Sequence, residues 1–588
     1  MAQFFKFLLA SCLGVIIASA VVFFGVIGII GAMASQGNVP KPVSDDSVLR
    51  ITFDNAIPEK TNNLEMDPFD FANDHILGVH DIIKSIEHAK TDDKIKGILI
   101  EADGVAAGFT TAGAVRRALA DFKSSGKFII AYSDYYTQGA YYMVSVADEI
   151  YVNPLGMVDF RGFAAQVPFF KDMLDRLGLK MQVFYAGKFK SATEPYRRDN
   201  MSEESKLQLR EYLNELYAVM LNDISESRGV NVADLRKAAD SYAANDPEAA
   251  VKLDLIDAVG YRDDALQDIR ERMGLETDKS INTISLEDYS RSVKTSDSGS
   301  DKIAVVYAEG TILDGKGDLG SVGSERYTKI INKIRKDDKI KAVVLRINSP
   351  GGSAIASENI WRELSLLRET GKPVIASMGD YAASGGYYIA CMADTIFAEP
   401  TTLTGSIGVF NIIPSAQKML ADKAGIRFDT VKTGRYAAGI SPFYDLSEDE
   451  KQLIQRRTEQ TYDIFLRRVA EGRKMDKAKV HEIAQGRVWT GVTADKIGLV
   501  DEIGTLNNAI ETAARMAGLE DYRISEYPQT KEPIEQFFDR FLNEDEEPYS
   551  KVLMRKQLGA WYPYYRYFED IQSSHGMQAR LPFVLQFQ

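Results

Sequence analysis

DKIKGILI occupies residues 93–100, and the similar DKIKAVVL occupies residues 338–345, an offset of 245 residues. Three further pairs keep almost the same offset: GK at 126 and 371, YY at 141 and 387, and LIDAVG at 255 matched by LVDEIG at 499. A nearly constant offset over this much sequence indicates an internal duplication. The chain therefore contains two copies of one structural unit.

Each copy alternates short apolar runs with longer amphipathic segments, which is typical of an α/β fold. In the second copy we expect strands at 303–307, 342–347, 374–377 and 395–398, and helices at 358–368 and 446–471. The pattern therefore predicts two tandem α/β domains.

Changes in composition mark the boundaries between these units. Residues 276–300 are rich in Ser, Thr and Asp, which is linker chemistry, and beyond about residue 518 an acidic segment gives way to an aromatic run. The predicted organisation is an anchor at 1–35, a first domain at 46–275, a linker at 276–300, a second domain at 301–517 and a tail at 518–588.

The bulk composition restricts the classes of function. The net charge of −14 over 588 residues argues against sequence-independent nucleic-acid binding, which needs a basic surface. The two cysteines, Cys12 and Cys391, lie far apart and form no disulfide framework. None of the five histidines has the spacing of zinc ligands. We therefore expect no metal, no cofactor and no nucleic-acid partner.

The N-terminus carries a long apolar run. Residues 7–34 contain no charged side chain, and a helix of that length, at about 1.5 Å per residue, exceeds the roughly 30 Å of hydrocarbon in a bilayer. We predict an uncleaved transmembrane anchor here. A cleaved signal peptide is the alternative, because Ala32-Met33-Ala34 has the form of a cleavage site, although the apolar region of such peptides is usually shorter.

The two copies differ at a serine that lies between two glycines. TLTGSIGV at 402–409 places Ser406 on a tight turn and the N–H of Ile407 directly after it, whereas the first copy has Phe160 at the matching position. Such a turn suits a nucleophile, although a polar turn residue is the alternative reading. The duplication favours the nucleophile, because only one copy keeps the serine.

A second difference lies between an expected strand and an expected helix. The second copy has NSPGGS at 348–353, where Gly351 and Gly352 allow backbone N–H groups to approach a ligand closely, and the first copy has EADG at 101–104 instead. These glycines are candidates for an oxyanion hole, with a simple turn as the alternative. The first copy has therefore lost this loop as well as the serine.

A nucleophilic serine needs a base. His481 falls within 475–485, which we expect to be an exposed helix, so a Ser-His-Asp triad is poorly supported. The first copy offers GKFKSA at 187–192, in which Lys190 matches Ala437 of the second copy. Each copy thus lacks what the other has, which predicts one composite site per chain; a merely solvated lysine is the alternative.

Four motifs together resemble the long, duplicated form of the signal peptide peptidase A (protease IV) family. They are NSPGG at 348–352, TLTGSIG at 402–408, GKFKSATEP at 187–195 and GRVWTG at 486–491. The similarity covers roughly residues 45–515 and the anchor, and leaves the tail after about 518 without a role.

The resemblance implies a fold and a set of roles. The expected fold is two tandem ClpP/crotonase-like domains, and the expected site is a Ser/Lys dyad with Ser406 as nucleophile and Lys190 as general base. The oxyanion donors would be N–H groups near Gly351, Gly352 and Ile407. A hydroxyl near the lysine is also expected, for which Thr433 is the candidate.

The same resemblance implies a setting for this site. The enzyme would be a homotetramer on the periplasmic side of the bacterial inner membrane, and its substrates would be cleaved signal peptides and other apolar extended peptides. A crotonase-type acyl-CoA enzyme and a non-catalytic membrane scaffold are the alternatives. Turnover of a CoA thioester would indicate the first, and labelling of Ser406 by a serine-reactive probe would exclude the second.

Overall fold

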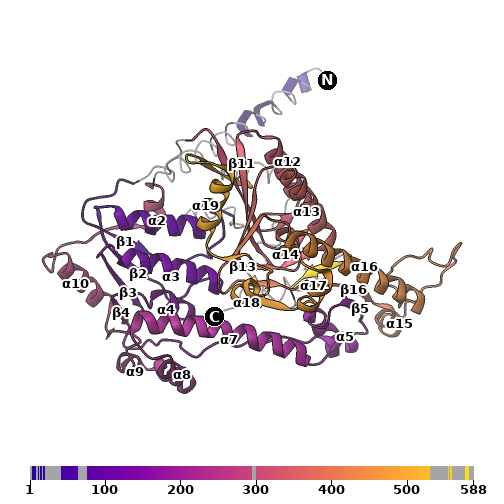
Figure 1. The fold of residues 1–588 in the computed structure, drawn as a ribbon, viewed down its shortest axis with the longest axis horizontal. Helices are drawn as coiled ribbons and strands as arrows, with labels where there is room; N and C mark the ends of the chain where they lie inside the picture. The colour runs from indigo at the N-terminus through magenta and orange to yellow at the C-terminus, as the bar shows by residue number, and fades with distance from the viewer. Residues whose placement is uncertain are drawn as a thin grey trace.

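The computed structural model describes residues 41–63, 76–293, 299–529 and 576–581, with scattered positions between 3 and 25 and at 554, 557 and 558. Within these residues the two copies form two parallel sheets with flanking helices. Figure 1 shows the first copy in indigo to magenta beside the second in pink to yellow. The α/β prediction and the duplication are confirmed.

The sheet of the first copy has six parallel strands in the order β6-β4-β3-β2-β1-β7. Its strands are β1 (Ser47–Ile51), β2 (Ile95–Glu101), β3 (Phe128–Ser133), β4 (Glu149–Val152), β6 (Ala258–Val259) and β7 (Asn282–Ser285). The central strands are mostly apolar and buried, as in ILI at 98–100 of β2 and FIIA at 128–131 of β3. Such runs are typical of parallel strands that are covered on both faces.

The sheet of the second copy repeats this order. Within its eight strands, six parallel strands run β18-β14-β13-β11-β8-β19, and β15 (Leu403–Gly405) and β17 (Val488–Thr490) extend the sheet from the end of β13. They are β8 (Lys302–Glu309), β11 (Ile340–Ser349), β13 (Val374–Ala383), β14 (Thr395–Ala398), β18 (Glu502–Ile503) and β19 (Arg523–Tyr527). All four strands predicted in this copy are confirmed. The bridge between Tyr136 and Val158 in the first copy matches the pair Ala382 and Thr404 in the second at an offset of 246, so Phe160 and Ser406 are equivalent.

The helices repeat in the same way. In the first copy they are α2 (Val79–Thr91), α3 (Phe109–Lys123), α4 (Gln138–Val144), α5 (Lys171–Leu177), α7 (Glu203–Arg228), α8 (Val232–Ser241), α9 (Pro247–Lys252) and α10 (Arg262–Arg272). In the second they are α12 (Ser324–Lys336), α13 (Ala354–Arg368), α14 (Gly385–Ala390), α15 (Gln417–Lys423), α16 (Glu448–Arg473), α17 (Lys477–Ile483), α18 (Gly491–Lys496) and α19 (Leu506–Ala517). Both helices predicted in the second copy, at 358–368 and 446–471, are confirmed as α13 and α16, each with slightly different ends.

A third sheet joins the two copies. Its order is β10-β9-β12-β20-β16-β5, from β5 (Lys180–Ala186), β9 (Ile312–Leu313), β10 (Val322–Gly323), β12 (Gly351–Ser353), β16 (Val409–Ser415) and β20 (Gln578–Arg580). Strand β5 belongs to the first copy but pairs antiparallel with β16 of the second, from Ala186 opposite Val409 to Lys180 opposite Ser415. This exchange brings the end of β5 to the second copy.

Two predicted boundaries fall between strands that pair with one another. The linker at 276–300 contains β7, which pairs with β1, and helix α11 (Leu286–Ser290), so the first domain continues past residue 275. The second domain continues past residue 517, because β19 pairs with β8. Both β7 and β19 lie at the edge of their sheets, close to the polar segments on which the predicted boundaries rest.

The anchor predicted at 1–35 lies largely outside the described residues. Among the helices that the structure does describe, none combines the length and the apolar character needed to cross a bilayer.

Candidate active site

Ser406 occupies a strained turn between two strands. It follows β15 (Leu403–Gly405) and precedes β16, and its φ of 50° lies in the left-handed region, which a residue with a Cβ seldom adopts. The N–H of Ser406 donates to the carbonyl of Arg487 at 2.7 Å, and the side chain is completely buried. Strain of this kind concentrates at functional sites, where the surrounding structure enforces it.

Lys190 reaches this turn from the first copy. The chain turns after β5 at Gly187, whose φ of 106° suits only glycine, and a Cβ there would lie 2.4 Å from the carbonyl carbon of Gln485. The Lys190 Nζ atom then lies 3.0 Å from the Oγ atom of Ser406 and donates to the Ser406 carbonyl at 3.1 Å. The structure therefore brings together the two residues that the duplication singled out.

The environment of Lys190 favours its neutral form. The side chain is only 1% exposed, and burial lowers the pKa of Lys190 well below its ordinary value, with no charged neighbour contributing to the shift. A neutral amine has the lone pair that a general base needs. Lys188 is exposed, so only the second lysine of the GKFK run has this environment.

The hydroxyl beside the lysine is that of Ser384 and not the predicted Thr433. The Lys190 Nζ atom lies 2.9 Å from the Ser384 Oγ atom, and Ser384 is fully buried before α14 with a φ of 56°. Thr433 lies on the exposed segment 422–437. The sequence could have indicated Ser384 in the same way as Ser406. At an offset of 246 the first copy has Gln138 in its place, so this hydroxyl too is present in only one copy.

The predicted oxyanion glycines lie beside this site. Gly351 has a φ of 94°, and a Cβ on it would lie 2.7 Å from the N atom of Gly385, at the start of α14. Its N–H donates to the Oγ atom of Ser349 at 3.2 Å, and Gly352 pairs with Ile312 and Ala579 in the third sheet. Among the described residues, the N–H of Ile407 has no acceptor. It is the donor in this group that is free to meet an oxyanion.

Strand β20, from the tail that had no predicted role, covers the glycine turn. It runs antiparallel to β12, with Gly352 opposite Ala579, and also meets β16 at Phe410. The N–H of Leu581 donates to the carbonyl of Pro350 at 2.8 Å. Ala579 is completely buried, so this short strand helps to exclude solvent from the site.

Other candidate groups lie elsewhere. His481 is exposed on α17, as expected, and its Nδ1 atom lies 3.0 Å from the hydroxyl of Tyr462 rather than near Ser406. In the part of the chain that the structure describes, no three His, Cys, Asp or Glu side chains are grouped to hold a metal ion. The chemistry that remains is that of a buried serine and a buried amine.

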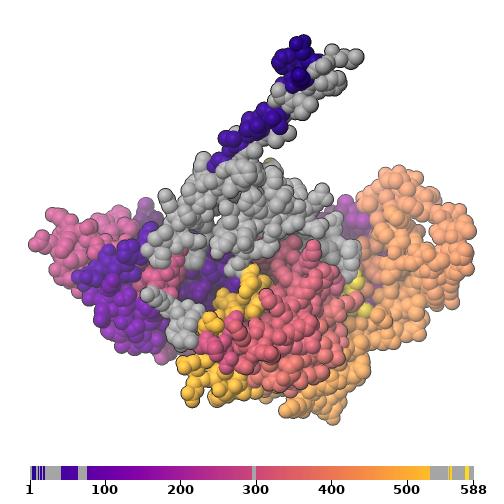
Figure 2. All heavy atoms as spheres, turned by 90° about the horizontal axis from the view of Figure 1, so that it is seen from above, coloured from indigo at the N-terminus to yellow at the C-terminus, as the bar shows by residue number. Residues whose placement is uncertain are grey.

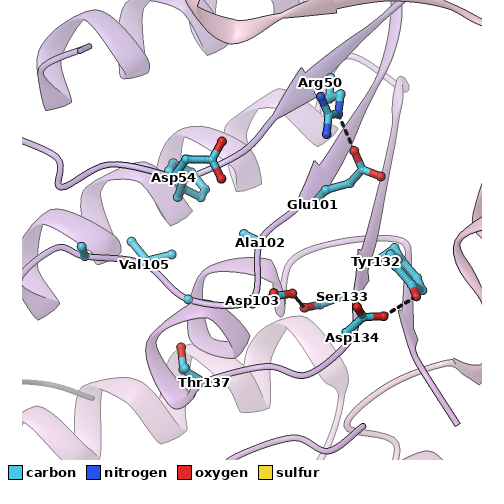
Figure 3. Close-up of a pocket in the computed structure, with 13 residues that line it drawn as sticks. Arg50, Asp54, Glu101, Ala102, Asp103, Val105, Tyr132, Ser133, Asp134 and Thr137 are labelled. Atoms are coloured by element: carbon cyan, nitrogen blue, oxygen red, sulfur yellow. Dashed lines mark hydrogen bonds and ion pairs between the residues drawn. The ribbon is translucent and has the colours of Figure 1, made fainter. Parts of the chain in front are cut away.

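The first copy keeps an open pocket of about 550 Å³ at the equivalent sheet edge (Figure 3). Its walls carry Glu101, which is ion-paired with Arg50, and Asp103, which accepts a hydrogen bond from the Ser133 hydroxyl. Phe160, the equivalent of Ser406, is completely buried in the hydrophobic core. The scaffold of a site is present in this copy, but the serine and the glycine turn of the second copy are not.

Comparison with known proteins identifies close relatives. The model of peptidase family S49 matches residues 121–276 and 367–520, once in each copy. Protease 4 of Haemophilus influenzae is 38% identical over 75% of this chain and 73% of its own length, and Protease 4 of Salmonella typhi is 36% identical over 78% and 75%. The chloroplastic serine protease SPPA of Arabidopsis thaliana is 35% identical over 75% of this chain and 66% of its own.

Proposed function

The chain belongs to peptidase family S49 and is a serine protease, and from this premise we propose that Ser406 and Lys190 form its catalytic dyad and cleave extended apolar peptides. The observation that carries the proposal is the 3.0 Å separation of the Lys190 Nζ and Ser406 Oγ atoms in a fully buried setting. This distance lies within the reach of about 2.6–3.2 Å that general-base catalysis requires.

The geometry supports a simple sequence of proton transfers. Neutral Lys190 accepts the hydroxyl proton as the Ser406 oxygen attacks the peptide carbonyl, and the N–H of Ile407 faces the developing oxyanion. The resulting ammonium donates its proton to the leaving amine, and the acyl-enzyme is then hydrolysed by water that Lys190 activates. The Ser384 hydroxyl keeps the amine directed at Ser406.

Strand β20 supports an extended peptide as the substrate. A peptide strand already lies between β12 and β16 beside the dyad, held by backbone hydrogen bonds and with a small buried side chain at Ala579. Recognition by strand addition gives affinity through the backbone and specificity through alternate side chains. We propose that substrates bind in the place of β20, and that they include signal peptides left in the membrane.

The test combines a probe with a peptide assay. The purified full-length protein should cleave a fluorogenic apolar peptide, and a fluorophosphonate should label it at one site. Ser406→Ala should abolish both signals, while Ser441→Ala, which changes a serine outside this site, should abolish neither. Labelling that persists in Ser406→Ala would exclude Ser406 as the nucleophile.

We further propose that residues 7–34 form an uncleaved anchor and that the catalytic body lies on the outer side of the bacterial inner membrane. The support is the uncharged run of full spanning length. An N-terminus at Met1 or Ala2 in protein purified from membranes is the expected result. A mature N-terminus at about Ser35, on protein that washes off membranes, would contradict it.

We also propose a homotetramer built by strand exchange between chains. Within one chain β5 pairs with β16, and their equivalents at an offset of 246 are residues 426–432 and 163–169, which belong to no strand in the described structure. Residues 426–432 are all exposed, in the region that projects from one side of the molecule in Figure 2. A contact between unlike surfaces of this kind repeats from chain to chain, and it closes into a ring of four when each chain is rotated by a quarter turn from the last.

The register of the proposed contact is testable. Repeating the β5–β16 register between chains places Phe428 opposite Val167 and Ile426 opposite Phe169, so apolar residues face apolar residues. Ala165→Cys with Thr430→Cys, in a Cys12→Ser background, should form intermolecular disulfides up to a tetramer. Ala165→Cys paired with Arg427→Cys, about 10 Å out of register, should not. A monomer at micromolar concentration would contradict the proposal.

A further inference from the structure

The two halves of the dyad rest on one backbone segment, residues 485–488. The N–H of Phe189, next to Lys190, donates to the Gln485 carbonyl at 2.9 Å, and the N–H of Ser406 donates to the Arg487 carbonyl at 2.7 Å. The segment therefore holds one neighbour of each catalytic candidate. Its contact with the lysine is close, because a Cβ on Gly486 would lie 2.7 Å from the Cβ of Lys190.

One buried side chain links this segment to the lysine loop. Gln208, on α7 of the first copy, is 1% exposed. Its Nε2 atom donates to the Phe189 carbonyl at 3.1 Å and to the Ser191 hydroxyl at 2.9 Å, on either side of Lys190. Its Oε1 atom accepts from the N–H of Val488 at 3.3 Å.

Val488 connects Gln208 to the nucleophile. In the antiparallel pair of β15 and β17 (Val488–Thr490), Val488 lies opposite Gly405, the residue before Ser406. The Gln208 amide thus touches the residues flanking Lys190 and, through one strand pair, the residue before Ser406. It touches neither reacting atom.

We propose that Gln208 is a positioning residue that sets the distance between the Lys190 amine and the Ser406 hydroxyl across the two copies. The inference rests on the proposed dyad. Phe189 and Val488 come from different copies, and the amide is the right length to satisfy a carbonyl on one and an N–H on the other. A displacement of about 1 Å in such a pair costs on the order of 10²-fold in rate.

Helix α7 supplies a matched control for a purely structural role. Glu215 lies seven residues after Gln208 and also joins the copies, because its carboxylate accepts from the hydroxyls of Thr490 and Thr493. Glu215 is two helical turns away from Gln208 and bonds no residue adjacent to the dyad. Loss of its charge weakens the same interface without loosening the lysine loop.

The experiment compares Gln208→Met with Glu215→Gln in the full-length protein. Gln208→Met keeps the length of the side chain and removes all three hydrogen bonds. It should lower kcat for a fluorogenic peptide by 10- to 100-fold with KM changed less than threefold. It should also move the rising limb of the pH–rate profile, which reports the neutral Lys190 amine, to higher pH, because water that enters a looser site favours the ammonium. Glu215→Gln should change neither kcat nor the profile, even if its melting temperature falls equally.

Four outcomes separate the possibilities. A Gln208→Met enzyme with wild-type kcat and profile would overturn the inference and leave the dyad intact. Equal losses of kcat in both variants, in proportion to their losses of stability, would also overturn it. Gln208 would then only stabilise the contact between the two copies. A Ser406→Ala enzyme with the activity of wild type would instead overturn the proposed dyad and this inference with it. Partial recovery in Gln208→Glu, which retains the acceptor for Val488, would support the inference.

Discussion

The same sheet edge has opposite character in the two copies. In the second, the turn after β11 holds glycines against α14, strand β20 covers it, and Ser406 is fully buried. In the first, the turn after β2 begins at Glu101, held by Arg50 and Arg262, and opens into a pocket. The two copies share strand order and helices, but only the second keeps the serine and the glycine turn at this edge.

The exchange of one strand explains how a single site can combine residues of both copies. Strand β5 leaves the first copy and pairs with β16, so the lysine loop that follows it arrives beside Ser406. In the proposed dyad, the first copy supplies the base and the second the nucleophile. Neither sheet has both, although their strand orders are the same.

The largest effect is expected from removing either member of the dyad. Ser406→Ala and Lys190→Ala should each lower kcat/KM by about 10⁴-fold or more, because nucleophile and base act as a unit. The double variant should be no worse than either single one. Lys188→Ala, which changes the exposed neighbour, should stay within about twofold of wild type. An inactive Lys188→Ala beside an active Lys190→Ala would show that the base is misassigned.

Restoring a serine to the first copy should not restore activity. Phe160→Ser in a Ser406→Ala background places a hydroxyl where no lysine and no glycine turn are present, so peptidase activity should remain absent. The same change removes a fully buried aromatic ring and should lower the free energy of unfolding by about 3–5 kcal/mol, as measured by urea denaturation. Measurable turnover would contradict the division of chemistry between the copies.

The hydroxyl beside the lysine should contribute less than the dyad. Ser384→Ala should lower kcat by about 10- to 100-fold, because the amine loses the group that directs it toward Ser406. Thr433→Ala, on the exposed segment, is the control and should leave kcat unchanged. An impaired Thr433→Ala enzyme beside an unimpaired Ser384→Ala enzyme would mean that the exposed segment 422–437 reaches the site in the working enzyme.

The pH profile should report the neutral lysine. Burial lowers the pKa of Lys190, so the rate should rise as pH rises through that pKa and level off well below the pKa of free lysine, about 10.4. The unfolded chain binds this proton and the folded chain does not, so stability should also rise with pH between the two pKa values. Lys190→Met should remove both dependences and stabilise the fold at neutral pH. A rate limb that disappears with His481→Ala would contradict the dyad.

The smallest effect is expected from uncovering the glycine turn. Deleting residues 576–588 should lower KM for an apolar peptide by a few-fold and speed fluorophosphonate labelling, because the substrate no longer competes with β20. Ala579→Glu in the full-length chain should act in the same direction, since the site of that small side chain is fully buried. Unchanged labelling in both variants, with melting temperatures showing intact folds, would mean that β20 is not a barrier.

Much of this protein was determined by its sequence alone. The repeat at 93–100 and 338–345 predicted two equivalent α/β units, because apolar runs of that length need cover on both faces wherever they occur. The mismatches at Ser406 and Lys190 predicted a composite site, because duplicated sequences can be compared position by position. Ser384 could have been found by the same comparison with Gln138.

Only the tertiary structure decided how the copies meet. The exchange of β5, the placement of β20 on the glycine turn and the hydrogen bonds of Gln208 all join residues more than 150 positions apart or lying in different copies. Hydrophobic periodicity predicts which face of a strand is buried, but it carries no information about which distant edge will pair with it. The same reason applies to β7 and β19, which are strands only because β1 and β8 offer them an edge.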